Sequence, residues 1–151
     1  MRKNTIYELQ KFFKIEELVC PHTFRAFGGR SWQFLSTELL TILLVLRREI
    51  FQSPMTINNY HIKGDFSQRG YRCNICQIPK DKTLQGKIYL SAHCNGEGLD
   101  CDIKGFTAEQ ARQKIKANID KLPYNVRVEA GVTWLHIDTY DNGDKYTEFI
   151  G

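Results

Sequence analysis

The sequence predicts an α+β fold in which N-terminal helices pack on a small, mainly antiparallel sheet. Three observations support this class: apolar residues recur at helical spacing in the first third of the chain, short alternating segments follow, and one further helical pattern interrupts them. A chain of 151 residues with 42% hydrophobic residues fits one globular domain, so a single domain over residues 1–151 is expected.

Three helices are expected. A short helix covers residues 5–13, and the longest covers residues 32–51, where apolar residues recur at intervals of three and four. A third helix begins at Thr107, because Gln110 stands three residues later in the spacing of a capping box, and it ends shortly before Pro123.

Alternating or short apolar segments predict strands at residues 55–58, 98–103, 126–131 and 133–138. The last two lie close together in the chain and should form an antiparallel pair. An Asn-Gly turn then precedes a last strand that ends at Ile150. Residues 59–90 are rich in Gly, Lys and Asp with weak periodicity, which indicates a long irregular loop.

Charge and cysteine content exclude several classes of protein. The net charge of +4 is spread along the chain without a Lys/Arg run, so we expect no nucleic-acid partner. The longest apolar stretch, residues 39–46, is too short to span a membrane, and the first 18 residues show no signal peptide, which favours cytoplasmic synthesis. Five cysteines, an odd number, indicate reduced thiols rather than a disulfide framework.

One constellation of residues suggests a metal site. His93 and Asp100 are separated by a glycine-containing turn, and His136 and Asp138 lie on a later strand. Two imidazoles and one carboxylate are the ligands of many catalytic zinc sites, which keep a fourth position for water. Such chemistry also needs a carboxylate to take and return a proton. Glu129, on the strand before His136, is the candidate.

Two other interpretations remain open. A histidine in a strand is commonly a structural residue, and His22 is interpreted as a structural or surface histidine that could also line the cleft. The cysteines offer a rival site, a four-thiolate structural zinc made by Cys73, Cys76, Cys94 and Cys101. The first pair has zinc-ribbon spacing, but the second pair is separated by six residues.

Two motifs resemble those of a known family. "SAHCNGEGLD", Ser91 to Asp100, resembles the Ser-x-His-x-x-Gly-x-Ala-x-Asp signature of the zinc D-Ala-D-Ala carboxypeptidases, a family that includes vancomycin-resistance dipeptidases and phage L-alanyl-D-glutamate endolysins. "WLHID", Trp134 to Asp138, resembles its second motif, Trp-x-His. "TINN" and "RGYR" further resemble a phage and prophage branch, so the likeness spans about residues 55 to 140.

The resemblance implies a role for each matching residue. His93, Asp100 and His136 would bind Zn²⁺, and Glu129 would be the general base. Arg72 would be the substrate arginine, with Arg69 as the second choice. The remaining implied residues are the substrate-binding Ser91 and Trp134, and Asp138, which would orient a ligand imidazole from the second coordination shell.

The resemblance therefore implies a hydrolase, a zinc metallopeptidase that cleaves a bond next to a D-amino acid in peptidoglycan stem peptides by means of a zinc-activated water. Its action would be that of a D,D-carboxypeptidase or an endopeptidase in cell wall degradation. A monomer without a membrane partner is expected, released by a phage or associated with a virion. The alternative is a non-catalytic cell-wall-binding or virion structural module that retains the fold.

Overall fold

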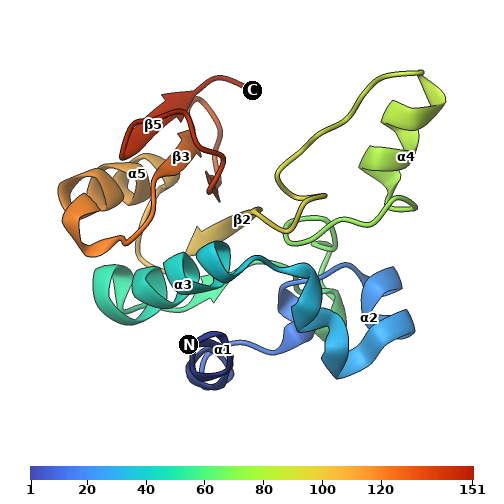
Figure 1. Cartoon of the computed structure of the whole chain (residues 1–151), viewed down its shortest axis with the longest axis horizontal. Coiled ribbons are helices and arrows are strands. Elements are labelled where there is room, and N and C mark those ends of the chain that lie inside the picture. The colour runs from blue at the N-terminus through green and yellow to red at the C-terminus, as the bar shows by residue number, and fades with distance from the viewer.

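The computed structural model describes residues 1–151, and helices precede most strands along the chain, as the sequence predicts (Figure 1). The α-helices are α1 (Arg2–Leu9), α2 (Pro21–Phe27), α3 (Thr37–Val45), α4 (Gln77–Leu84) and α5 (Ala108–Ala117). The strands are β1 (Met55–Thr56), β2 (Gly98–Ile103), β3 (Val126–Glu129), β4 (Leu135–Asp138) and β5 (Tyr146–Phe149).

The strands form one mixed sheet in the order β1-β2-β4-β3-β5. All neighbouring strands are antiparallel except β3 and β5, which run parallel. The predicted antiparallel pairing of β3 with β4 is confirmed, and so is the α+β class with a mainly antiparallel sheet. The last strand adds to the edge of β3 instead of pairing with β4 across the preceding turn.

Strand alternation separates the two faces of the sheet. On β2 and β4, Leu99, Cys101, Leu135 and Ile137 belong to the hydrophobic core, whereas the residues between them are polar. Successive side chains of a strand point to opposite faces, so the polar residues of both strands gather on the face away from the core. This polar face carries the candidate site.

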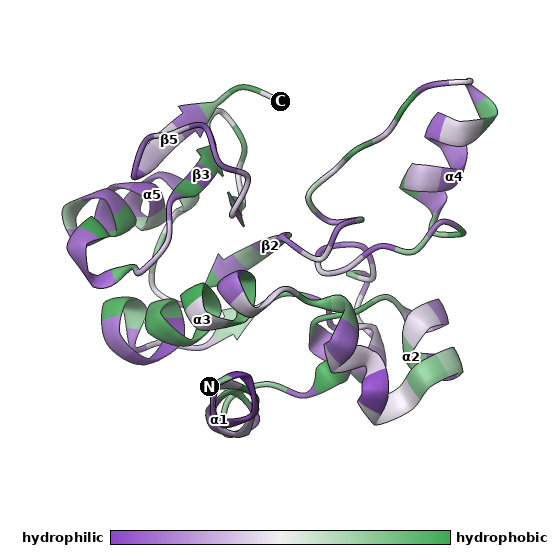
Figure 2. Cartoon of the chain, in the orientation of Figure 1, coloured by the Kyte–Doolittle hydropathy of each residue, from purple (hydrophilic) through white to green (hydrophobic).

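Helix α3 forms much of the other side of the core. Six of its nine residues are buried, and Figure 2 shows it as one of the most hydrophobic elements. The Ser36 hydroxyl caps the helix by accepting a hydrogen bond from the Leu39 N–H at 3.1 Å. Helix α5 covers the core near β2 and β4, and its predicted capping box between Thr107 and Gln110 is confirmed.

The prediction of one helix over residues 32–51 is wrong at its start. Gly28–Phe34 form a 3-10 helix, Leu35 is extended, and α3 begins only at Thr37. Ser36 is a strong N-cap residue, and its side chain stops the apolar periodicity from continuing as helix towards Trp32. The C-terminal end at Phe51 agrees with the prediction, although the last turn is a π-helix.

Two further corrections concern short helices. The predicted loop over residues 59–90 contains α4 and a 3-10 turn at Tyr60–Ile62. Pro79 obscured α4 in the sequence, yet proline is tolerated in the first turn of a helix because those N–H groups lack an intrahelical partner. The helix predicted over residues 5–13 lies at Arg2–Leu9, and α2 was not predicted. No helix has the length and apolar character needed to cross a membrane.

Candidate metal centre and active site

The structure brings His93, Asp100 and His136 together on the polar face of the sheet. Asp100 on β2 is the direct register partner of His136 on β4, and His93 lies in the turn that leads into β2. The Asp100 Oδ1 atom is 2.8 Å from His136 Nδ1, and Asp100 Oδ2 is 3.3 Å from His93 Nε2. All three side chains are buried, and one ligand atom from each lies within 4.8 Å of the others.

The second ring nitrogen of each histidine is already occupied. His93 Nδ1 lies 2.9 Å from the Gly70 carbonyl oxygen, and His136 Nε2 lies 2.8 Å from Asp138 Oδ2. An acceptor on one nitrogen places the proton there and leaves the other nitrogen with a free lone pair. The other nitrogen of each ring faces Asp100 and is the atom that would coordinate a metal.

The spacing of these atoms fits zinc. Nitrogen and oxygen ligands at about 2.0–2.1 Å from a tetrahedral zinc would be separated by about 3.3 Å. The separation of 3.3 Å between Asp100 Oδ2 and His93 Nε2 agrees with this value, whereas His136 Nδ1 lies at hydrogen-bond distance, 2.8 Å, from the other carboxylate oxygen of Asp100. The donor set, the burial and the fixed ring orientations therefore suit a zinc ion with three protein ligands.

Two glycines make the turn before β2 possible. Gly96 has φ +70°, and a Cβ there would lie 1.9 Å from the Phe34 carbonyl oxygen. A Cβ at Gly98 would lie 2.8 Å from the Ala92 Cβ and 3.1 Å from the Asp138 Cβ. A side chain at Gly96 would push the turn that carries His93 away from Phe34, and one at Gly98 would push β2 away from Ala92 and Asp138.

Asp138 supports His136 from the sheet. Its carboxylate is fully buried, and it accepts two hydrogen bonds of 2.9 Å from Arg127 and one of 3.1 Å from the Tyr140 N–H. Burial opposes the charge on Asp138, but the bonds from His136 and Arg127 outweigh burial and lower the pKa of the carboxyl. Asp138 thus remains an anion that holds the His136 imidazole in place.

The pKa shifts of Asp100 and His136 show how the two groups stabilise each other. Burial disfavours both charges, yet the hydrogen bonds and charges of the two histidines lower the pKa of Asp100. The bonds to Asp100 and Asp138 likewise outweigh burial and raise the pKa of His136 to about 9. Without metal, a proton on His136 balances the two carboxylates. A metal cation would replace that proton.

A cavity of about 410 Å³ opens over this face. One wall is the sheet, including Glu129, His136 and Phe149, and the opposite wall includes Lys82 and Tyr89 from the segment around α4. Register pairs Val128 with Ile137, so the next residues along, Glu129 and His136, lie side by side on the polar face. Glu129 therefore has access to the same cavity as the three candidate ligands.

Of the two candidate arginines, the structure brings only Arg72 into the cavity. Its guanidinium is buried, donates to the Gln68 carbonyl at 2.6 Å and to the Tyr89 hydroxyl at 2.8 Å, and lies 3.5 Å from Asp100 Oδ2. Arg69 does not line this cavity. Its guanidinium donates to the Asp102 carboxylate at 3.0 and 3.1 Å. Asp102 lies two residues after Asp100, near the exposed end of β2.

Ser91 and Trp134 also line the cavity. The Ser91 hydroxyl accepts a hydrogen bond of 3.2 Å from the His93 N–H, so it stabilises the turn that carries this histidine. The indole N–H of Trp134 is buried without a hydrogen-bond partner in the chain. A second cavity, of about 520 Å³, is lined by Trp134 and by residues of α5. None of the residues in the clusters that could bind a metal lines this second cavity.

A second cluster was not predicted: Cys20, His22, Cys73 and Cys76 could hold a metal ion. The alternative of a four-thiolate site is therefore wrong, because Cys20 and His22 stand in the cluster in place of Cys94 and Cys101. Cys101 lies in the hydrophobic core, because strand alternation turns it away from Asp100, and burial raises the pKa of its thiol. Cys94 also lies outside the cluster. The signal in the sequence was the "CPH" segment at 20–22, which supplies a Cys-x-His pair to the later Cys-x-x-Cys.

Comparison with known proteins gives no match to any family model, any curated protein or any solved structure.

Proposed function

We propose that this protein is a zinc metallopeptidase that hydrolyses a peptide bond next to a D-amino acid in peptidoglycan stem peptides. The observation that carries the proposal is the convergence of Glu129 and Arg72 on the cavity that contains His93, Asp100 and His136. These residues come from four separate segments of the chain, and each belongs to a stretch that resembles a motif of the family.

Each of these residues has a separate role in hydrolysis. When bound by His93, Asp100 and His136, zinc supplies a Lewis acid that lowers the pKa of water to about 7. The Glu129 carboxylate accepts the proton from the attacking water and returns it to the leaving amine. The buried Arg72 guanidinium, fixed by its bonds to Gln68 and Tyr89, stabilises negative charge on the substrate oxygen.

The substrate class rests on the two family motifs and on the chemistry of the cavity. Cationic Arg72 and Lys82 stand opposite the carboxylate of Glu129, so the cavity can hold a peptide carboxylate and leave Glu129 free for proton transfer. The unpartnered indole N–H of Trp134 can donate to a peptide carbonyl. Peptidoglycan stem peptides offer both groups beside a D-amino acid, as a carboxypeptidase or an endopeptidase requires.

The first test is a digest of purified peptidoglycan with zinc-loaded protein, analysed by mass spectrometry. We expect new muropeptides shortened at a bond to a D-amino acid, and none with His93→Ala. Absence of new products with the wild type, or cleavage by His93→Ala at the wild-type rate, refutes the proposal.

Glu129→Gln separates an enzyme from a wall-binding module. The substitution keeps the shape of the side chain but removes the base, so turnover should fall by about 10²- to 10⁴-fold while the zinc content stays the same. A binding module would keep wall binding in this variant and show no turnover in the wild type. Arg69→Gln, outside the cavity, is the matched control and should retain turnover.

A further inference from the structure

We propose that Cys20, His22, Cys73 and Cys76 form a second, structural zinc site that anchors the α4 segment to the N-terminal helices. The His22 Nδ1 atom lies 3.6 Å from the sulfur of Cys73 and 3.6 Å from that of Cys76. The two sulfurs are 3.8 Å apart, and the ligand atoms of all four residues lie within 4.8 Å of one another.

These separations are those of a tetrahedral zinc site. Zn–S bonds of about 2.3 Å and Zn–N bonds of about 2.05 Å at tetrahedral angles place two sulfurs about 3.8 Å apart, and sulfur and nitrogen about 3.6 Å apart. The observed values between Cys73, Cys76 and His22 agree with both. A disulfide would bring two sulfurs to about 2.05 Å, and all five cysteines are free thiols.

The ligand set indicates both the metal and its role. Three thiolates and one imidazole favour zinc over hard cations, which prefer oxygen ligands. Four protein ligands complete a tetrahedron and leave no position for water, so this site differs in kind from the three-ligand centre at His93, Asp100 and His136. The cysteine site is therefore structural.

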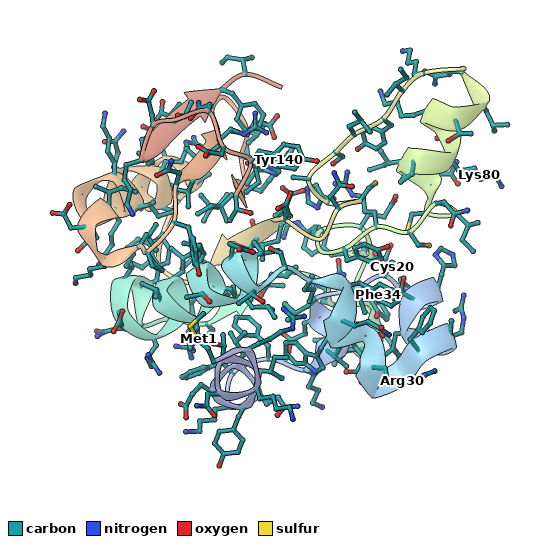
Figure 3. All side chains as sticks on the ribbon, viewed as in Figure 1. Met1, Cys20, Arg30, Phe34, Lys80 and Tyr140 are labelled. Atoms are coloured by element: carbon teal, nitrogen blue, oxygen red, sulfur yellow. The ribbon has the colours of Figure 1, made fainter.

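The backbone holds the two halves of the cluster side by side. The Tyr71 N–H donates to the Leu18 carbonyl at 2.8 Å, and the Cys20 N–H donates back to the Tyr71 carbonyl at 3.0 Å. Cys20 is the N-cap residue of α2, and Cys76 is the N-cap residue of α4. Figure 3 places Cys20 between α2 and the base of α4, so a metal there would join the starts of both helices.

The α4 segment has few other attachments. Helix α4 and the loop behind it project from the rest of the chain (Figure 1), and Pro79 is the one buried residue of the helix. The large apolar side chains of Leu84, Ile88 and Leu90 are exposed. Lys82 and Tyr89 of this segment nevertheless form one wall of the cavity. A metal at its base would hold that wall in place.

Metal content of the full chain, purified under reducing conditions, tests the site directly. We expect two zinc ions per wild-type chain, one in Cys73→Ser and one in His93→Ala, because each variant removes a ligand of a different cluster. Cys94→Ser, a thiol outside the cluster, should keep both. Because these measurements do not involve catalysis, they remain valid even if the protein is not a peptidase.

Cobalt substitution identifies the ligands. Co²⁺ bound by Cys20, Cys73 and Cys76 should give intense thiolate-to-cobalt charge-transfer bands that persist in His93→Ala and are lost in Cys73→Ser. Absence of these bands in the wild type overturns the proposal without relying on the folding of any variant. Bands that persist at full intensity in Cys73→Ser also overturn it.

Limited proteolysis tests the anchoring role. In the His93→Ala protein, where the cysteine cluster is the remaining metal site, chelation should accelerate tryptic cleavage at Lys80, Lys82 and Lys87 at least about tenfold, because local opening exposes the segment. Cleavage at Lys104, an exposed residue after β2, should be unaffected. Equal cleavage of the α4 segment with and without chelator would show that the metal does not anchor it.

Discussion

Asp138→Asn is the substitution that best examines how the sheet supports the candidate metal centre. The Asp138 carboxylate is fully buried and takes part in four hydrogen bonds: two from Arg127 at 2.9 Å, one with His136 at 2.8 Å and one from the Tyr140 N–H at 3.1 Å. Asparagine has nearly the same shape, but it replaces one acceptor oxygen with an N–H₂ donor. The substitution therefore changes hydrogen bonding with little change in packing.

Either orientation of the new amide disrupts two of these four bonds as they stand in the wild type. An amide nitrogen in the Oδ2 position faces donors of Arg127 and His136, and one in the Oδ1 position faces donors of Arg127 and Tyr140. At about 1–1.5 kcal/mol for each bond, the free energy of unfolding should fall by about 2–3 kcal/mol. Arg127 is about a quarter exposed and can regain water, which limits the loss.

The same change should weaken metal binding. With the amide nitrogen towards His136, the bond between the two side chains re-forms only if Nε2 becomes an acceptor and the proton moves to Nδ1, the atom that faces Asp100. Removal of such a supporting carboxylate typically costs 10- to 100-fold in metal affinity. Urea unfolding would measure the stability, and competition with a chromophoric chelator would measure zinc affinity at the centre formed by His93, Asp100 and His136.

Asp102→Asn is the matched control. Asp102 also binds an arginine through two bonds, of 3.0 and 3.1 Å to Arg69, but its side chain is 52% exposed and outside the cavity. A pair whose carboxylate is exposed in this way contributes about 0–1 kcal/mol, and the control should leave zinc affinity unchanged. Equal stability and equal zinc affinity in the Asp138 and Asp102 variants would refute the assignment of Asp138 as the supporting group.

Three further predictions address the turn before β2, the proposed substrate arginine and the start of α3. Gly96→Ala should lower the free energy of unfolding, measured by urea titration, by more than about 2 kcal/mol, because the new Cβ would lie 1.9 Å from the Phe34 carbonyl oxygen. Gly105 has φ +89° but open space around it, so Gly105→Ala should lower it by only about 1 kcal/mol. Arg72→Lys should lower kcat/KM for muropeptide hydrolysis at least about tenfold, whereas Arg69→Lys should leave it unchanged. Equal kcat/KM values in the two variants would contradict this prediction. Ser36→Ala should cost about 1 kcal/mol in thermal or urea unfolding through loss of the α3 cap, and an unchanged stability would show that the cap is replaceable.

Local rules predicted much of the sheet and of the candidate centre. Strand alternation identified β2, β3 and β4, and the capping box identified the start of α5. The register of β2 and β4 then brings Asp100 opposite His136, so residues 36 positions apart in sequence form one site. The features that were predicted correctly each depend on a periodic pattern or a motif within one short segment of the sequence.

What the sequence did not reveal depends on contacts between distant segments. The Cys-x-His pair at 20–22 and the Cys-x-x-Cys pair at 73–76 are both visible in the sequence, but no local pattern shows that they are neighbours, because the bridge between Val19 and Tyr71 is set by tertiary packing. The choice between Arg69 and Arg72 likewise required the structure, since the partners Asp102 and Asp100 lie on a different element. Short helices such as α4 lack the long periodic pattern from which helices are predicted.

The two clusters differ in how much of the chain must be synthesised before each can form. The cluster of Cys20, His22, Cys73 and Cys76 is complete once the ribosome has released residue 76, whereas the other centre also needs His136. Chains emerge from the N-terminus, so a zinc ion at the cysteines would join α2 and α4 before β2, β3 and β4 exist. During translation the segment that carries Arg72 would then be fixed first, and the sheet would assemble against it.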